Sequence, residues 1–342
     1  MRSLASACAL ALVLNVLGQG HGLSPERFLF SVRHFGVKEG LPHRRVSQLA
    51  ADPQGYLWAA TPAGLVRWDG YVFVNHTRAN GLARDGAEQV ACDGDGRLWV
   101  LHEDGKLDIL DPHTGKALPA RAHFAGKGIP LSEEPVTGLV AANDGTIVYA
   151  QAGRLVRYRS AQSGFQVTSP LCGSNLFPYK VEVAGDVWCI CSQGRRGWNE
   201  GELIHVNAWP AAADGPGPTV TRVAGIYNVF QGGHDLLDTL PRPTVGVDVL
   251  LMRASARVHP THEVVPRNDG AALAEQQLAL DAGMVRMPLA KELCLVNTQF
   301  RRMREGDDPQ HAELLFDIAS VVPQARFKTY DALRDRQGNL WI

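Results

Sequence analysis

A short pattern of aspartate, glycine and tryptophan recurs along this chain, and it restricts the fold more than any other feature. Each clear copy contains an aspartate, a glycine, a tryptophan and a second glycine, in that order. The first copy carries Asp52, Gly55, Trp58 and Gly64, and the second carries Asp93, Gly96, Trp99 and Gly105. Each landmark lies 41 residues from its counterpart, a coincidence that chance rarely produces. The chain therefore contains an internal repeat.

Less regular copies continue the repeat toward the C-terminus. They span residues 136–158, 185–204 and 278–287, with a faint copy at 245–259. A last copy begins at residue 330 and is cut off at the end of the chain. The recurring glycines and tryptophans of these copies are Gly145, Gly153, Trp188, Gly338 and Trp341.

Each copy reads as a meander of short apolar strands joined by tight turns. Asp-Gly and Asn-Gly turns between β-rich runs are hairpin signals. One meander cannot bury both of its faces, so copies at a period of about 40 to 50 residues stack as the blades of a β-propeller. The sequence therefore predicts an all-β propeller with about six blades and the start of a seventh. Residues 271–281 and 308–321 are also compatible with helices.

The recurring residues have distinct expected roles. We expect the tryptophans to pack between neighbouring blades, and the alternative is a platform on which a ligand stacks. We expect the glycines to supply backbone conformations with positive φ. Asp52 and Asp93 are expected to form the tight turns.

Composition excludes several other classes of protein. The chain has 342 residues and a net charge of −1, without a dense run of lysine and arginine. We therefore expect no binding of nucleic acid. The 35 glycines and 20 prolines disfavour a bundle of long helices. After the N-terminus no apolar stretch is long enough to predict a membrane-spanning helix.

The N-terminus has the plan of a secretory signal. Arg2 precedes an apolar run at residues 4–17, and the small residues Gly18 and Gly20 follow. This order of charge, apolar core and small residues is typical of a cleaved leader, so we predict export to the periplasm. A buried N-terminal segment is the alternative.

Removal of such a leader would leave five cysteines, an odd number, so at least one thiol would stay outside any disulfide. Cys189 and Cys191 lie two residues apart in a strand-like run and share a face. Cys172 could reach one of them in an oxidising compartment. Buried thiols that act as small apolar residues are the alternative.

Signatures of catalytic and metal sites are absent from the sequence. It contains no nucleophile elbow, no His-Glu-x-x-His and no Walker A loop. We therefore predict no catalytic residue, no metal site and no cofactor. The loop with Arg195, Arg196 and Trp198 is the candidate for ligand binding, because guanidinium groups grip carboxylates or sulfates and an indole stacks on a sugar. An ordinary exposed loop is the alternative.

One longer motif is more specific than the repeat period. It runs from Gly40, Leu41 and Pro42 through the first repeat to Asp69 and Gly70. This segment closely resembles the two-component regulator propeller repeat. The resemblance is strong over residues 28–111 and 330–342, moderate over 136–158 and weak over 160–329. The ending of the chain, from Asp335 to Trp341, is the same motif caught in mid-repeat.

This resemblance implies a non-catalytic, periplasmic ligand-sensing propeller of a two-component or cyclic-di-GMP type receptor. Members usually continue with more repeats, a membrane span and an output module, so the resemblance implies a truncated sensor. The implied signal is a small molecule or carbohydrate. The full-length receptor would form a homodimer and meet the membrane only through the missing downstream segments. A propeller-fold enzyme, such as a lyase or quinoprotein, and a protein-interaction scaffold are the alternatives.

The expected organisation has four parts. Residues 1–20 form the signal peptide, 21–45 an N-terminal strand and linker, 46–329 the blades, and 330–342 the start of a further repeat. Propellers usually close by pairing their first and last strands, which removes open edges. We expect the interrupted last repeat to leave the domain marginally stable or incompletely closed, which size-exclusion chromatography and thermal melting would test.

Overall fold

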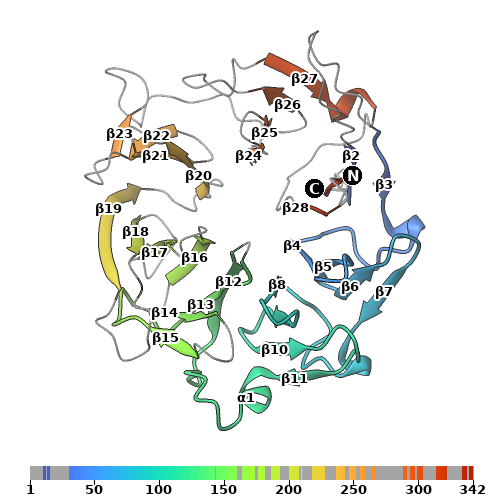
Figure 1. The fold of residues 1–342 in the computed structure, drawn as a ribbon, viewed down its shortest axis with the longest axis horizontal. Helices are drawn as coiled ribbons and strands as arrows, with labels where there is room; N and C mark the ends of the chain where they lie inside the picture. Colours follow the sequence, from blue (N-terminus) through green and yellow to red (C-terminus); the bar gives the residue numbers. More distant parts are fainter. Residues whose placement is uncertain are drawn as a thin grey trace, which may run out of the picture. The chain divides into compact units, whose positions relative to one another are not determined.

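The computed structural model consists almost entirely of short antiparallel strands (Figure 1). Two compact units are present: His76–Ala279, and Met1–Asn75 together with Leu280–Ile342. The structure describes residues 11–12, 14–15, 31–142, 144–159, 164–173, 176–181, 186–192, 200–207, 209, 218–227, 236–242, 246–251, 255–258, 264–266, 288–290, 293–296, 299–302, 313–321, 333–336 and 339–341.

The unit His76–Ala279 contains four described four-stranded sheets, each a meander in which consecutive strands are neighbours. Blade 2 consists of β8 (Gln89–Cys92), β9 (Leu98–Leu101), β10 (Leu107–Leu110) and β11 (Ala117–Pro119). Blade 3 consists of β12 (Val136–Ala141), β13 (Ile147–Gln151), β14 (Arg154–Tyr158) and β15 (Phe165–Val167). Blade 4 consists of β16 (Leu176–Val181), β17 (Val187–Ser192), β18 (Glu200–Asn207) and β19 (Thr219–Tyr227). Blade 5 consists of β20 (Leu236–Arg242), β21 (Gly246–Leu251), β22 (Ser255–Val258) and β23 (Val264–Pro266).

The second unit carries two four-stranded sheets and two smaller ones among its described residues. Blade 1 consists of β4 (Gln48–Ala51), β5 (Leu57–Thr61), β6 (Gly64–Trp68) and β7 (Phe73–His76). Blade 6 consists of β24 (Pro288–Ala290), β25 (Leu293–Val296), β26 (Gln299–Arg302) and β27 (Glu313–Asp317). The smaller sheets pair β1 (Ala11–Leu12) with β3 (His34–Phe35), and β2 (Leu14–Asn15) with β29 (Asn339–Trp341) and β28 (Leu333–Arg334).

Short helical segments connect some of these strands. The α-helix α1 (Ala120–His123) follows blade 2. Three 3₁₀ turns are η1 (Val37–Glu39), η2 (Arg78–Asn80) and η3 (Ile318–Ser320). Sequence reasoning allowed a helix over 308–321, but the described residues Glu313–Asp317 form β27. Their backbone pairs with β26, and the consecutive apolar residues lack a helical period. Residues 271–281 lie outside the described part of the chain.

The prediction of an all-β propeller fold is confirmed by these sheets. The described residues form six four-stranded blades, in line with the expected number. The last repeat supplies β28 and β29, and its sheet is extended by β2 near the N-terminus. Sequence reasoning assigned Leu14 and Asn15 to the leader and did not foresee a strand there.

Burial falls from the central strands to the outer strand in blades 1 to 3. Every residue of β5, β9 and β13 is buried, whereas β11 and β15 contain no buried residue. Central strands of the blades are covered on both faces, so they read as continuous apolar runs without alternation. Within His76–Ala279, one apolar cluster joins blades 2 and 3, and a second joins blades 3 and 4.

The repeated glycines have positive φ. The values are 92° at Gly55, 146° at Gly64, 82° at Gly96, 74° at Gly105, 80° at Gly145 and 68° at Gly153. Gly145 is further restricted because its carbonyl accepts a hydrogen bond from Gly94 N of the neighbouring blade at 3.1 Å. A Cβ at this position would lie 2.3 Å from Gly94 N. Two turns thus approach closely where only glycine fits.

We expect Gly145→Ala to destabilise the protein more than Gly126→Ala. Each substitution places alanine at positive φ, which costs about 1 to 2 kcal/mol. Gly126 has φ 75° and no atom within 4 Å of an added Cβ, so it isolates the conformational cost. Gly145→Ala adds the clash with Gly94. Urea unfolding of both variants measures the difference, and equal losses would contradict the proposed close approach.

Candidate functional site

An aspartate carboxylate holds the recurring tryptophan in three of the described repeats. In each, one aspartate oxygen accepts a hydrogen bond from the indole Nε1–H six residues later. The pairs are Asp52 and Trp58 at 2.8 Å, Asp93 and Trp99 at 2.9 Å, and Asp335 and Trp341 at 2.9 Å. The other oxygen of Asp52 accepts the backbone N–H groups of Gln54 and Tyr56 at 3.0 and 2.9 Å. The turn and the tryptophan are therefore fixed by one side chain.

Trp99 shows what this anchoring achieves. Its ring is fully buried and lies 6.1 Å from the ring of Tyr149 and 5.4 Å from that of Tyr158, both on blade 3. Trp99 therefore packs between two neighbouring blades. Trp188 is also buried, and its ring stacks on His205 of the same blade at 4.2 Å. Sequence reasoning did not foresee this aromatic pair.

Arg97 forms the densest polar cluster at the boundary between blades 2 and 3. Its Nε donates to Asp93 Oδ2 at 2.9 Å, and its Nη2 donates to Asp95 Oδ2 at 2.5 Å and to the Tyr158 hydroxyl at 2.6 Å. Its Cζ also lies 5.5 Å from the centre of the Phe124 ring and 5.6 Å from that of Tyr158. The guanidinium is thus engaged within the protein, and the cluster fastens one blade to the next.

The surroundings of Arg97 and Tyr158 fix the protonation states of these two side chains. Burial would lower the pKa of Arg97, but the Asp93 carboxylate and the Tyr158 hydroxyl outweigh it, so the pKa is raised. Burial raises the pKa of Tyr158, against the opposing effect of Arg97. The guanidinium therefore stays charged and the phenol stays neutral across the physiological range.

His123 makes the same boundary sensitive to acid. Its Nε2 lies 3.4 Å from Arg97 Nη1. Burial, Arg97 and Lys127, in that order, lower the pKa of His123, while Asp93 and Asp111 oppose them. The folded protein therefore takes up this proton less readily than the unfolded chain does. Its contribution to stability is present above the ordinary pKa of 6.5 and is lost as the pH falls through the lower pKa of the folded state.

We expect His123→Gln to make stability less dependent on pH between pH 7 and 5. Glutamine keeps a polar group near Arg97 but takes up no proton. The loss of stability at low pH that His123 causes should therefore disappear. The measurement is the free energy of unfolding in urea at several pH values. His113→Gln, at an exposed histidine of the same unit, is the matched control against which the change in slope is read. An unchanged slope in His123→Gln would contradict the assignment.

A second polar cluster is buried inside blade 2. His102 Nε2 lies 2.9 Å from Asp108 Oδ2, and His102 Nδ1 lies 2.6 Å from the Gly86 carbonyl oxygen. Asp108 Oδ2 also accepts the backbone N–H of Ala83 at 2.6 Å. Both side chains are almost fully buried, so this pair organises the loop that enters the blade.

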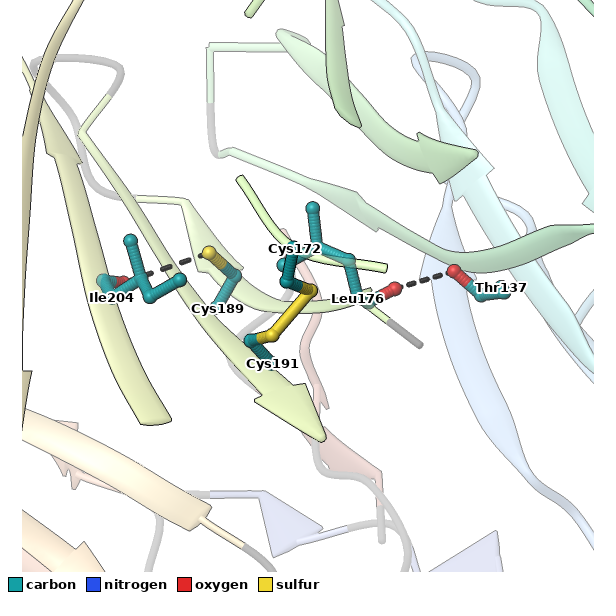
Figure 2. Close-up of a disulfide and its surroundings, with 6 residues drawn as sticks. All are labelled: Thr137, Cys172, Leu176, Cys189, Cys191 and Ile204. Atoms are coloured by element: carbon teal, nitrogen blue, oxygen red, sulfur yellow. Dashed lines mark hydrogen bonds between the residues drawn. A yellow bond between two sulfur atoms is a disulfide. The ribbon is translucent and has the colours of Figure 1, made fainter. Parts of the chain in front are cut away.

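Among the described cysteines, Cys172 and Cys191 form a disulfide with a Cα–Cα distance of 6.1 Å (Figure 2). Cys189 lies outside the disulfide, and its Sγ lies 3.6 Å from the Ile204 carbonyl oxygen. Sequence reasoning left open whether Cys172 pairs at all and with which of the two cysteines. The structure selects Cys191.

The candidate ligand loop lies outside the described residues. This applies to Arg195, Arg196 and Trp198, and also to Gly338 of the repeat. Among the described residues no three histidine, cysteine or acidic side chains gather in a geometry that could hold a metal ion. In the same part of the chain no helix has the length and apolarity needed to cross a membrane.

Comparison with known proteins matches the repeat and the fold. Residues 40–63 match the two component regulator propeller family. No curated protein is significantly similar in sequence to this chain.

Solved structures share the architecture at low sequence identity. One is the extracellular domain of a protein described as the hybrid two component system BT3049 from B. thetaiotaomicron, with TM-score 0.55, 14% identity and coverage of 91% of this chain and 40% of that one. Another is PorZ of Porphyromonas gingivalis, a surface component of the type-IX secretion system, with TM-score 0.56, 13% identity and coverage of 92% and 48%. A third is YCF48 bound to D1 peptide, with TM-score 0.52, 12% identity and coverage of 86% and 92%.

These likenesses show the fold, and the chain spans less than half the length of the first two proteins. The matched segment 40–63 contains β4, the Asp52 turn and β5, which form the first hairpin of blade 1. The sequence match and the repeated geometry thus agree. The chain is a β-propeller that carries the two-component regulator propeller repeat.

Proposed function

We propose that this chain is the exported, ligand-sensing propeller of a bacterial receptor of two-component or cyclic-di-GMP type, without catalytic activity of its own. The observation that carries the proposal is the match of residues 40–63 to the two-component regulator propeller repeat. The extracellular domain of BT3049, described as part of a hybrid two component system, shares the fold. The ligand would be a small molecule or a carbohydrate.

Export is supported by two separate features. The N-terminus has the order of charge, apolar core and small residues that typifies a secretory signal. The Cys172–Cys191 disulfide fits an oxidising compartment such as the periplasm. A ligand would act by binding one state of the receptor more tightly than the other, since equal binding shifts no equilibrium.

The purified chain tests this proposal in a thermal-shift screen. The panel contains neutral sugars, sugar acids, amino acids and short organic acids, and each mixture is analysed by mass spectrometry after incubation. We expect at least one class to raise the melting temperature without being converted. At a concentration of about 100 Kd a ligand adds about 2.7 kcal/mol to stability. Conversion of a ligand to product would favour the enzyme alternative and overturn the proposal.

A protein-interaction scaffold is the second candidate. The structure of YCF48 favours this candidate. The similarity extends over 92% of the YCF48 chain, which was solved with a bound peptide. A scaffold would give no shift with any small molecule but a stable complex with a protein or peptide. Incubation of the chain with a random peptide library, run beside the thermal-shift screen, separates the two functions.

A further inference from the structure

The last repeat begins a seventh blade, called blade 7 below, with its strands β28 and β29. The turn between them is closed by a hydrogen bond from Asp335 N to the Asn339 carbonyl oxygen at 2.9 Å, the same bond that closes the first turn of blade 1. Asp335 also holds Trp341, as described above. Arg336 Nη1 donates to the Pro53 carbonyl oxygen of blade 1 at 2.6 Å. Blade 7 therefore starts with the geometry of a complete repeat and contacts blade 1.

Two short strands from the N-terminal apolar run occupy the place of the third strand of blade 7. β2 pairs antiparallel with β29, and Leu14 lies opposite Leu340. β1 ends two residues before β2 begins and pairs antiparallel with β3, where Ala11 lies opposite Phe35. In blade 1 the third strand, β6, likewise lies between the second and the fourth strand. β1 and β2 thus connect the second strand of blade 7 to β3, which takes the position of the fourth.

The register of β2 is that of a third strand. In blades 1 to 3, the residue five positions after the one that opens the first turn pairs with a large apolar residue of the third strand. The pairs are Leu57 with Trp68, Leu98 with Leu110, and Ile147 with Tyr158. In blade 7 the residue five positions after Asp335 is Leu340, and it pairs with Leu14. A leucine therefore stands where the complete blades have tryptophan, leucine or tyrosine.

The place that β1 and β2 fill is bordered by buried aromatic side chains. Phe35 and Trp341 are each 4% exposed, and their ring centroids lie 5.9 Å apart. The Phe35 ring also lies 4.8 Å from that of Trp68 in blade 1, within one apolar cluster. Without β1 and β2, the strands β3 and β29 would present unpaired backbone groups beside this cluster, and such edges readily take up an added strand. The place therefore suits an extended apolar segment.

We propose that β29 and β3 form a strand-binding site, and that the chain's own segment 11–15 occupies it for as long as the leader is attached. Strand addition of this kind draws its affinity from backbone hydrogen bonds and its specificity from the side chains that the register selects. The leader proposed above extends over residues 1–20, and its apolar core contains the residues that blade 7 takes up. Folding of blade 7 and recognition of the leader therefore exclude each other. This proposal rests on the exported state proposed above and adds a control of export by folding.

The first test measures amide hydrogen exchange by mass spectrometry on the full chain with its leader. Leu14→Pro cannot stay in a strand that has neighbours on both sides, because proline lacks the backbone donor. We expect the amides of β3 and β29 to exchange at least tenfold faster in Leu14→Pro than in the wild type, while those of β13 in blade 3 keep their rate. Leu4→Pro, in the same apolar run but outside residues 11–15, is the matched control and should exchange like the wild type. Equal exchange of β3 and β29 in all three chains would overturn the proposal.

Disulfide trapping tests the register directly. Leu14→Cys combined with Leu340→Cys places two thiols at directly opposite positions, where paired strands bring Cβ atoms to about 4.5 to 5.5 Å. We expect mild oxidation to join them, and mass spectrometry of the peptides identifies the bond. Leu4→Cys combined with Leu340→Cys is the control and should give at least tenfold less of the cross-link. Equal yields from the two pairs would contradict the register.

A separate measurement of export distinguishes this proposal from the proposed function. Alkaline phosphatase fused to the C-terminus of the whole chain reports export, because its disulfides form only in an oxidising compartment. An active fusion, together with protected β3 and β29 in the chain that keeps its leader, supports the proposal. An active fusion with unprotected β3 and β29 overturns the strand-binding site and leaves the proposed function intact. An inactive fusion with protected strands makes segment 11–15 a permanent strand, which overturns both the leader and the exported sensor.

Discussion

Asp93→Ala is expected to lower the free energy of unfolding by about 3 to 5 kcal/mol, the range found when one partner of a buried ion pair is removed. Asp93 is 3% exposed and accepts four hydrogen bonds. Two come from the backbone N–H groups of Asp95 and Arg97, one from Arg97 Nε and one from Trp99 Nε1. The substitution therefore leaves the turn, the guanidinium and the indole without their shared acceptor.

Two further variants sharpen this measurement. Asp93→Asn keeps one carbonyl acceptor without the charge and should lie between the wild type and Asp93→Ala. Asp111→Ala is the matched control, since Asp111 also caps a turn of blade 2, through the N–H groups of His113 and Thr114, but contacts no buried cation. Asp111→Ala should lower the free energy of unfolding by about 1 kcal/mol. Chemical unfolding followed by tryptophan fluorescence gives all three values, and equal losses for Asp93→Ala and Asp111→Ala would disprove the central role of Asp93.

Removal of the disulfide by Cys172→Ala is expected to cost about 3 kcal/mol. The bond joins residues separated by 19 positions, and its loss enlarges the freedom of the unfolded chain. Cys172 N lies 3.4 Å from the Gly153 carbonyl oxygen, and Cys191 lies on β17 (Figure 2). The disulfide therefore fastens the segment that leaves blade 3 to the second strand of blade 4.

The redox dependence supplies the control for this second prediction. Dithiothreitol should lower the melting temperature of the wild-type chain to that of Cys172→Ala and should not change the variant. Cys92→Ala, at a cysteine outside the disulfide, should keep the full response to dithiothreitol. A wild-type chain that is shown to be reduced yet melts unchanged would contradict a stabilising bond between the blades.

The first hairpins were predictable because their information is local. Asp52 and Gly55 lie within one turn, and the apolar runs on either side have the length of buried strands. The same reasoning found the second copy at Asp93 and placed strands there correctly. Sequence reasoning did not foresee the hydrogen bond from the tryptophan indole to the aspartate carboxylate, although the sequence carries a signal for it. The two residues recur together in the strong copies, and blade 3 has lost both, at Ala142 and Val148.

Contacts between blades had no such signal. Arg97 and Tyr158 are 61 residues apart, and each alone looks like an ordinary residue at the end of a strand. The choice of Cys191 over Cys189 as the partner of Cys172 was open for the same reason, because both lie on one face of one strand. The candidate loop with Arg195, Arg196 and Trp198 stays a prediction.

Local sequence thus sufficed for the repeat, the β class and the positions of the turns, because each turn is closed by residues a few positions apart. It also sufficed to recognise that residues 40–63 resemble the two-component regulator propeller repeat. The partners of Arg97 and the disulfide emerged only once the blades were packed. Each depends on how two separately formed sheets meet, and that fit is set by side chains far apart in the chain.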